Sequence, residues 1–133
     1  MGKDIVKIAV LPIVDKKLFL CRKKGLDFLV NLGGRPEEDE TDEECAAREV
    51  REETSCGITN LRYFTTVNGP RGDISGNIEL RCYFGDLTNT PSINPRDSIY
   101  EFVWIDRNWT QEGYKLPPTM QTLISKLVEQ GHL

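Results

Sequence analysis

The alternation of apolar and polar positions divides the chain into short strands and two helices. Residues 7–14 are largely apolar and apolar positions resume at residues 18–22, so Asp15-Lys16 between them predicts a hairpin, with Pro12 as a bulge or strand end. Further runs rich in aromatic and β-branched residues predict more strands. The predicted strands span residues 7–14, 18–22, 28–32, 61–67, 78–87 and 100–105.

The first predicted helix spans residues 41–54 and has a clear start signal. Thr41 is followed three residues later by Glu44, the spacing of a capping box. No Gly or Pro interrupts the helix, and one of its faces is suited to packing on a core. The residues of that face are Ala46, Ala47, Val50 and Thr54.

The second predicted helix begins at Pro117-Pro118 and ends at Gly131. Its apolar stripe consists of Met120, Leu123, Ile124, Leu127 and Val128. The order of strands, helix, strands and helix predicts an α/β fold in which a mixed sheet lies between helices. With 133 residues and neither repeats nor a linker, we expect one domain over residues 1–133.

Composition places the chain among soluble globular proteins of a reducing compartment. Hydrophobic residues make up 38% of the chain and charged residues 29%. The sequence contains no run of 18 apolar residues, so it predicts no membrane span. The first ten residues lack the features of a signal peptide. Four cysteines are scattered without a C-x-x-C pair, which favours free thiols over disulfides or zinc. We therefore expect a cytoplasmic protein.

Charge is distributed unevenly along the chain. Residues 34–56 hold ten acidic and three basic side chains, a local charge of −7, whereas the remainder holds eleven acidic and fourteen basic side chains, a charge of +3. This uneven distribution of charge fits a site that binds divalent cations through the acidic segment, in a protein whose remaining surface can bind phosphates. It is not the basic surface of a protein that binds nucleic-acid polymers.

Three carboxylates share one face of the first helix. Glu49, Glu52 and Glu53 stand at positions i, i+3 and i+4, so they repel one another unless water or a cation compensates. A solvated acidic helix is one interpretation, and a metal site is the other. Because the only histidine is His132, a metal site would favour Mg²⁺ or Mn²⁺, and Ser-His-Asp catalysis is excluded. A phosphate-binding G-x-x-x-x-G-K-[ST] loop is also absent.

The spacing of these residues resembles the Nudix box, G-x5-E-x7-R-E-U-x-E-E-x-G-U, in which U is aliphatic. The box begins here at Gly34 and ends at Cys56, which stands in place of an aliphatic residue, while Ser55 replaces the second glycine. That glycine ends the helix in a left-handed conformation, so Ser55 costs on the order of 1 kcal/mol unless Gly57 takes over the turn. The resemblance implies a Nudix-type α/β/α sandwich with a mixed β-sheet.

The resemblance also implies a reaction, the Mg²⁺-dependent hydrolysis of a nucleoside diphosphate linked to another moiety. The residues that match metal ligands are Gly34, through its carbonyl or that of Gly33, and Glu49, Glu52, Glu53 and, by a looser alignment before Trp104, Glu101. Glu52 or Glu53 would orient or deprotonate water. Arg48 and Glu40 match an ion pair that supports the ligand helix.

The substrate is the least determined part of the sequence-based prediction. Residues expected to contact it are Arg22, Arg35, Arg71 and, by stacking on a base, Phe28. Residues 68–77, which include Arg71, predict either a lid that recognises the base or a plain hairpin connection. The resemblance favours a (d)NTP or modified nucleotide as in MutT-like enzymes, with ADP-ribose or a nucleotide sugar, and a non-catalytic nucleotide-sensing module, as alternatives. Many relatives form homodimers, so the oligomeric state stays open.

Overall fold

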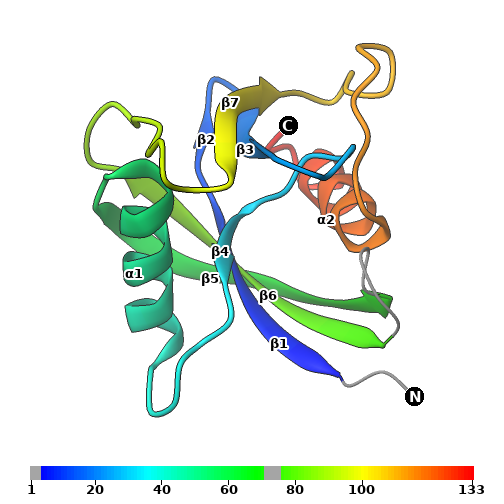
Figure 1. Ribbon diagram of the computed structural model, residues 1–133. Coiled ribbons are helices and arrows are strands. Elements are labelled where there is room, and N and C mark those ends of the chain that lie inside the picture. Colours follow the sequence, from blue (N-terminus) through cyan, green and yellow to red (C-terminus); the bar gives the residue numbers. More distant parts are fainter. Residues whose placement is uncertain (1–3, 71–75) are drawn as a thin grey trace.

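The computed structural model describes residues 4–70 and 76–133 (Figure 1). Two helices and seven strands are formed by these residues. In chain order the elements are β1 (Ile5–Leu11), β2 (Ile13–Val14), β3 (Lys17–Lys23), β4 (Leu32–Gly34), α1 (Asp42–Thr54), β5 (Ile58–Pro70), β6 (Asn77–Leu87), β7 (Ile99–Ile105) and α2 (Pro118–Glu129).

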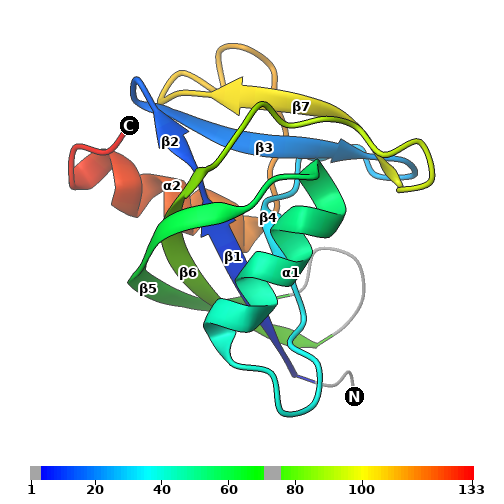
Figure 2. The same cartoon turned by 90° about the vertical axis from the view of Figure 1, so that its left-hand side faces the viewer.

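The strands form two sheets that lie between the helices. The larger sheet has the order β4-β1-β6-β5, in which β1 and β6 are parallel and the other pairs antiparallel. The smaller sheet, β2-β3-β7, is antiparallel throughout. Figures 1 and 2 show α1 and α2 on opposite sides of these strands. The predicted α/β sandwich with a mixed sheet is confirmed.

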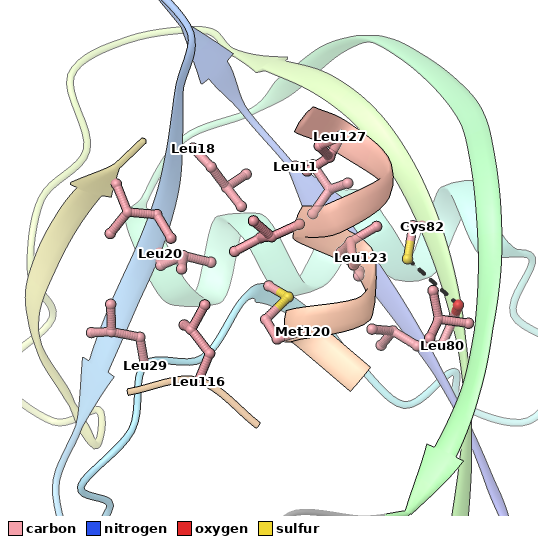
Figure 3. Close-up of a cluster of buried hydrophobic side chains, with 14 of the residues drawn as sticks. Leu11, Leu18, Leu20, Leu29, Leu80, Cys82, Leu116, Met120, Leu123 and Leu127 are labelled. Atoms are coloured by element: carbon pink, nitrogen blue, oxygen red, sulfur yellow. Dashed lines mark hydrogen bonds between the residues drawn. The ribbon is translucent and has the colours of Figure 1, made fainter. Parts of the chain in front are cut away.

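Alternation along the central strands explains the two-sided core. Ala9 and Leu11 of β1 join the buried cluster around α2, whereas Ile8 and Val10 join the cluster that includes α1. The same division continues in β3. Figure 3 shows the α2 cluster, with its labelled members Leu11, Leu18, Leu20, Leu29, Leu80, Cys82, Leu116, Met120, Leu123 and Leu127. Each helix is therefore fixed by its own apolar layer.

The first predicted strand is interrupted where proline stands. β1 ends at Leu11, and the Pro12 carbonyl accepts a hydrogen bond from the Phe19 N–H at 3.0 Å before β2 begins. Asp15 and Lys16 have φ of 53° and 59°, the left-handed pair that a two-residue hairpin turn requires. The predicted hairpin is confirmed, with Pro12 as the strand end.

The strand predicted over residues 28–32 is displaced toward the glycines. Val30 makes only an isolated bridge to Cys21, and the strand proper, β4, spans Leu32–Gly34. It pairs antiparallel with β1, and Gly34 lies opposite Ile8. The paired glycines are therefore part of the sheet itself.

The second half of the chain differs from the prediction mainly in length. β5 extends to Pro70, so it includes the start of the loop predicted over residues 68–77, and Arg71 lies outside the described residues. The strands predicted at 78–87 and 100–105 each begin one residue earlier. No helix in the described ranges is long and apolar enough to cross a membrane.

Both helices begin as predicted. The Glu44 N–H donates to the Thr41 hydroxyl at 3.1 Å and the Thr41 N–H donates to the Glu44 carboxylate at 3.0 Å, which confirms the capping box. The predicted core-facing side of α1 is wrong at one position, because Ala47 is exposed and Cys45 is buried instead. α2 buries Met120 and the rest of its predicted stripe except Val128, which is partly buried.

Candidate active site

A cavity of about 190 Å³ lies where the glycine strand, the end of α1 and the start of α2 converge. Its floor comes from β1 and β6, and its walls come from the segment before β4 and from α2. Most of the lining is apolar, with a few polar groups. The polar or charged residues on its lining are Lys7, Lys23, Asn31, Glu53 and Thr119.

Gly33 and Gly34 bring backbone against the carboxylates of α1. Gly33 has φ of 120°, and a Cβ there would lie 1.9 Å from the Ile8 carbonyl oxygen, so only glycine fits. A Cβ at Gly34 would lie 2.6 Å from the carboxyl carbon of Glu49. The absent side chain thus makes a recess that holds the Glu49 carboxylate against the strand.

Glu53 is the glutamate of α1 that lines the cavity. Its carboxylate accepts a hydrogen bond from the Gly33 N–H at 2.9 Å. Burial, followed by the charges of Glu49 and Asp97, raises the pKa of Glu53 to about 8, against the opposing effects of the Gly33 hydrogen bond and of Lys23. A carboxyl group with this pKa exchanges a proton near neutral pH.

Arg48 neutralises the other side of the same acidic face. Its Nε and Nη2 donate to the two carboxylate oxygens of Glu40 at 2.8 and 2.9 Å, a bidentate pair, and Nη2 also donates to the Arg35 carbonyl at 3.2 Å. The Arg48 hydrogen bonds hold the pKa of Glu40 down at about 2. The loop of residues 34–40 is thereby tied to α1.

Glu49 and Glu52 also lie against Arg48. The Arg48 Nη1 donates to Glu49 at 2.9 Å and approaches Glu52 at 3.5 Å. Burial raises the pKa of Glu49, and Arg48 opposes that rise. Glu52 has a side chain 56% exposed and makes the looser contact. The three glutamates predicted to share a face are therefore in three different environments.

The donor atoms around α1 suit a divalent cation in their chemistry, although they are not yet gathered into a site. Among residues 4–70 and 76–133 no three His, Cys, Asp or Glu side chains are already arranged to hold a metal ion. The donors present are nonetheless all oxygens, and burial raises the pKa values of Glu49 and Glu53, an effect that a bound cation would oppose. The recess at Gly34 brings backbone to the same place. This chemistry fits Mg²⁺ or Mn²⁺.

Other predicted site residues lie away from the cavity. Arg22 pairs with Glu101 across β3 and β7, and its guanidinium stands 5.7 Å from the ring centre of Tyr114. Neither Arg22 nor Glu101 lines the cavity. Arg35 contributes its carbonyl to Arg48 while its side chain is outside the lining, whereas Phe28 does line the cavity.

Two charged residues near Glu53 were not singled out from the sequence. Lys23, the neighbour of Arg22, lines the cavity and lowers the Glu53 pKa, and Asp97 raises it from the loop before β7. The basic cluster of residues 22–24 was a signal for Lys23, but its strand pairing with β7 shifts register between Arg22 and Lys23. Asp97 had no local signal, because only the fold brings its loop to α1.

The match to a family profile agrees with this geometry. The NUDIX domain matches residues 4–127, nearly the whole chain, and the chain belongs to the Nudix family. It is accordingly a member of a family of pyrophosphohydrolases in which divalent-metal dependence is typical. A search of curated protein sequences gave no match.

Solved structures share the fold at low sequence identity. The solution structure of the E. coli ORF135 protein aligns with a TM-score of 0.76 at 22% identity, covering 96% of this chain and 90% of that one. A MutT NUDIX hydrolase from Burkholderia pseudomallei aligns at 0.79 and 14% identity, covering 95% and 99%. A UDP-X diphosphatase aligns at 0.74 and 18% identity, covering 100% of this chain and 66% of that one. These likenesses establish the fold.

Proposed function

We propose that this Nudix protein hydrolyses the pyrophosphate bond of a nucleoside triphosphate, deoxynucleoside triphosphate or modified nucleotide. The observation that carries the proposal is the position of Glu53, which ends the acidic face of α1, lines the cavity and is held by the Gly33 N–H at 2.9 Å. Burial raises the pKa of Glu53 to about 8, so the group can act as a base once a bound cation favours its ionised form. The cavity beside Glu53 has a volume of about 190 Å³ and adjoins the glycine strand.

The roles of the remaining residues follow from their contacts. Glu49, Glu52 and Glu53, with the backbone of Gly33–Gly34, would hold Mg²⁺, which when bound neutralises charge on the diphosphate and acidifies the attacking water. Arg48 positions Glu49 and secures the glycine loop through Glu40. Lys23 lines the cavity next to Glu53, where its ammonium group can balance a phosphate.

The proposed catalytic group is thus Glu53, supported by Glu52, Arg48 and Glu40. Phe28 remains a proposed contact of the base, because it lines the cavity. Arg22 and Glu101 are engaged with each other, so we propose Lys23 and Asp97 as the charged groups that influence Glu53 from that side. The four free, buried cysteines support a reducing, cytoplasmic environment.

A nucleotide panel tests the proposal directly. Purified protein is incubated with the eight common NTPs and dNTPs, ADP-ribose and a UDP-sugar, with Mg²⁺, with Mn²⁺, or with a chelator, and the products are separated by ion-exchange chromatography. We expect a nucleoside monophosphate and pyrophosphate from at least one triphosphate, and no turnover with the chelator.

Different products would change the assignment in defined ways. Turnover of ADP-ribose or the UDP-sugar in preference to every triphosphate would replace the proposed substrate class with a nucleotide-diphosphate derivative. Binding of nucleotides without turnover under any metal condition would indicate a sensing module. Turnover that is equal with and without the chelator would contradict the proposed use of the α1 carboxylates.

A further inference from the structure

The loop before β7 joins the end of α1 to the end of β3. This loop, residues 88–98, follows β6 and passes over the C-terminal end of α1 before it enters β7 (Figures 1 and 2). The two elements that it joins carry charged groups of the candidate site, Glu53 on α1 and Lys23 on β3. Among residues 4–70 and 76–133, no hydrogen bond or ion pair connects α1 with β3 directly. Apart from apolar packing, the position of Glu53 relative to Lys23 therefore depends on the segments that join the two elements.

At the α1 side, the loop is bonded to the residues that follow Glu53. The Ser92 N–H donates to the Thr54 carbonyl at 2.9 Å, and the Cys56 thiol donates to the Asn89 carbonyl at 3.3 Å. Thr54 and Cys56 are both fully buried. Because a buried polar group that loses its partner pays the cost of desolvation, these bonds hold the loop to the helix end.

The Thr54 side chain fixes the same turn from within the helix. Its hydroxyl donates to the Val50 carbonyl at 2.7 Å and accepts a hydrogen bond from the Cys56 N–H at 3.1 Å. Since the Thr54 carbonyl also accepts from Ser92, this one residue connects the last turn of α1 with the loop. Thr54 is next to Glu53 in the chain, so a shift of the loop would move the backbone that carries the Glu53 carboxylate.

At the other side, the loop is bonded to the residue that follows Lys23. The Lys24 N–H donates to the Ser98 carbonyl at 2.9 Å, and Lys23 itself is paired with Ile99, the first residue of β7. Among the described residues, none from this loop lines the cavity. The loop can therefore act on the site only through the residues that it holds in place.

We infer that the loop of residues 88–98 is a positioning element of the site, which fixes Glu53 relative to Lys23 through its hydrogen bonds at both sides. Thr54 and Ser92 are accordingly positioning residues, which act through Glu53 and do not line the cavity. The effect on turnover rests on the proposed function, whereas the placement of the Glu53 carboxylate does not.

Ser92→Pro tests the inference, because it removes the N–H that donates to Thr54. Ser92→Ala is the matched control, since it keeps that N–H and changes only an exposed side chain. The first measurement is amide hydrogen exchange at Gly33, whose N–H donates to the Glu53 carboxylate at 2.9 Å. We expect the Gly33 amide to exchange at least about fivefold faster in Ser92→Pro and at the original rate in Ser92→Ala.

Turnover of a nucleoside triphosphate with Mg²⁺ is the second measurement. In Ser92→Pro kcat should fall about 10- to 100-fold with KM nearly unchanged, because the loop positions the reacting group but does not line the cavity. Lys23→Met separates this positioning from a general loosening of the fold. If the loop fixes Glu53 against Lys23, Ser92→Pro should lower kcat by a factor at least about fivefold smaller in the Lys23→Met background.

Three outcomes would overturn the inference. They are an unchanged Gly33 exchange rate in Ser92→Pro, equal effects of Ser92→Pro and Ser92→Ala, and losses of kcat that simply multiply in the double variant with Lys23→Met. Faster Gly33 exchange in a protein that hydrolyses nothing would retain the placement of Glu53 by the loop and refute the proposed function.

A second pair of variants maintains the test if Ser92→Pro fails to fold. Cys56→Ala removes the thiol that donates to the Asn89 carbonyl, so it should also accelerate Gly33 exchange. Cys82→Ala, at a buried cysteine of β6, is its control and should leave that rate unchanged. Equal exchange rates in these two variants would likewise overturn the inference.

Discussion

The two sides of the acidic helix face differ in how their negative charge is balanced. On one side Glu40, Glu49 and Glu52 lie around Arg48, which makes a bidentate pair with Glu40. On the other side Glu53 is turned toward the cavity and has one backbone N–H donor, at Gly33. The same helix therefore carries a compensated and an uncompensated carboxylate only a few residues apart.

The difference separates a structural task from a chemical one. Glu40 has a pKa of about 2, because its partner Arg48 favours the ionised form. Glu53 has a pKa of about 8, because burial favours the neutral form. A carboxylate that is fully paired stabilises the loop of residues 34–40, whereas a buried one whose pKa stays raised despite Lys23 is available to a metal ion or a proton.

The largest expected effect comes from exchanging the two carboxylates separately for amides. Glu53→Gln should lower turnover by about 10²- to 10⁴-fold. The melting temperature in metal-free buffer should stay the same or rise, because the amide has no proton that the folded protein must take up against the unfolded pKa. Glu40→Gln is the matched control on the compensated side and should retain much more activity at some loss of stability. Steady-state turnover and thermal melts of both variants measure the contrast. Undiminished turnover in Glu53→Gln would remove the assignment of Glu53 as the catalytic group.

Arg48→Ala should affect both stability and turnover. Arg48 is 24% exposed and Glu40 is 12% exposed, so the substitution should lower the free energy of unfolding by leaving these carboxylates without their donor. Turnover should fall as well, because Glu49 loses the contact that positions it. Urea denaturation and kcat/KM are the measurements, with Arg51→Ala, on the exposed side of α1, as the control. If activity alone fell, Arg48 would be a direct substrate contact instead.

The pH dependence of stability should have opposite signs for the two sides. Folded Glu53 retains a proton up to about pH 8 while the unfolded chain releases it near 4.5, so in metal-free protein stability is lost as pH rises through this window, by at most about 1.4 kcal/mol per unit. Glu40 does the reverse, because its stabilisation is present above 4.5 and is lost as pH falls toward 2. Urea denaturation across this range measures both.

Amide variants assign the two pH effects. Glu53→Gln should remove the loss of stability between pH 5 and 8, and Glu40→Gln should remove the loss below pH 4.5. Mg²⁺ should abolish the neutral-range effect in the unsubstituted protein, since the cation favours the ionised carboxylate. A neutral-range slope that persists in Glu53→Gln would show that another group titrates there.

The parts of this site that are local in sequence could be predicted, and those that depend on pairing could not. The capping box of Thr41 and Glu44 and the spacing of the α1 glutamates are properties of one helix, so the sequence identified them. The environment of Glu53 depends on Gly33, Lys23 and Asp97, which arrive from β4, β3 and the loop before β7. The spacing of residues along the chain does not predict which of these groups lie close together in the fold.

The choice between Arg22 and Lys23 illustrates this limit. Both belong to one basic cluster, and alternation along a strand sends neighbours to opposite faces. Which face meets the cavity depends on the register of β3 against β7, and that register shifts between these two residues. Arg22 consequently meets Glu101, while Lys23 reaches the cavity. The sequence alone identifies the basic cluster of residues 22–24 but does not predict which of its members lines the cavity.

The smallest expected effect on stability comes from a substitution at the C-terminal end of α1. This position lies outside both the Arg48 side and the Glu53 side of the helix face, so it tests whether the contrast between them depends on the helix end. Ser55, not Gly57, adopts the left-handed conformation, with φ of 63°, and its N–H donates to the Arg51 carbonyl at 2.9 Å. Ser55→Gly should therefore raise the free energy of unfolding by about 0.5–1 kcal/mol, because glycine adopts this φ without strain. Gly57→Ala, where φ is not left-handed, is the control that should not stabilise the protein.

Turnover should stay unchanged in Ser55→Gly, since the substitution alters neither the charge around Arg48 nor that around Glu53. A loss of turnover would instead mean that strain at the helix end sets the position of Glu53, and the uncompensated side would then owe its chemistry to the backbone as well as to burial.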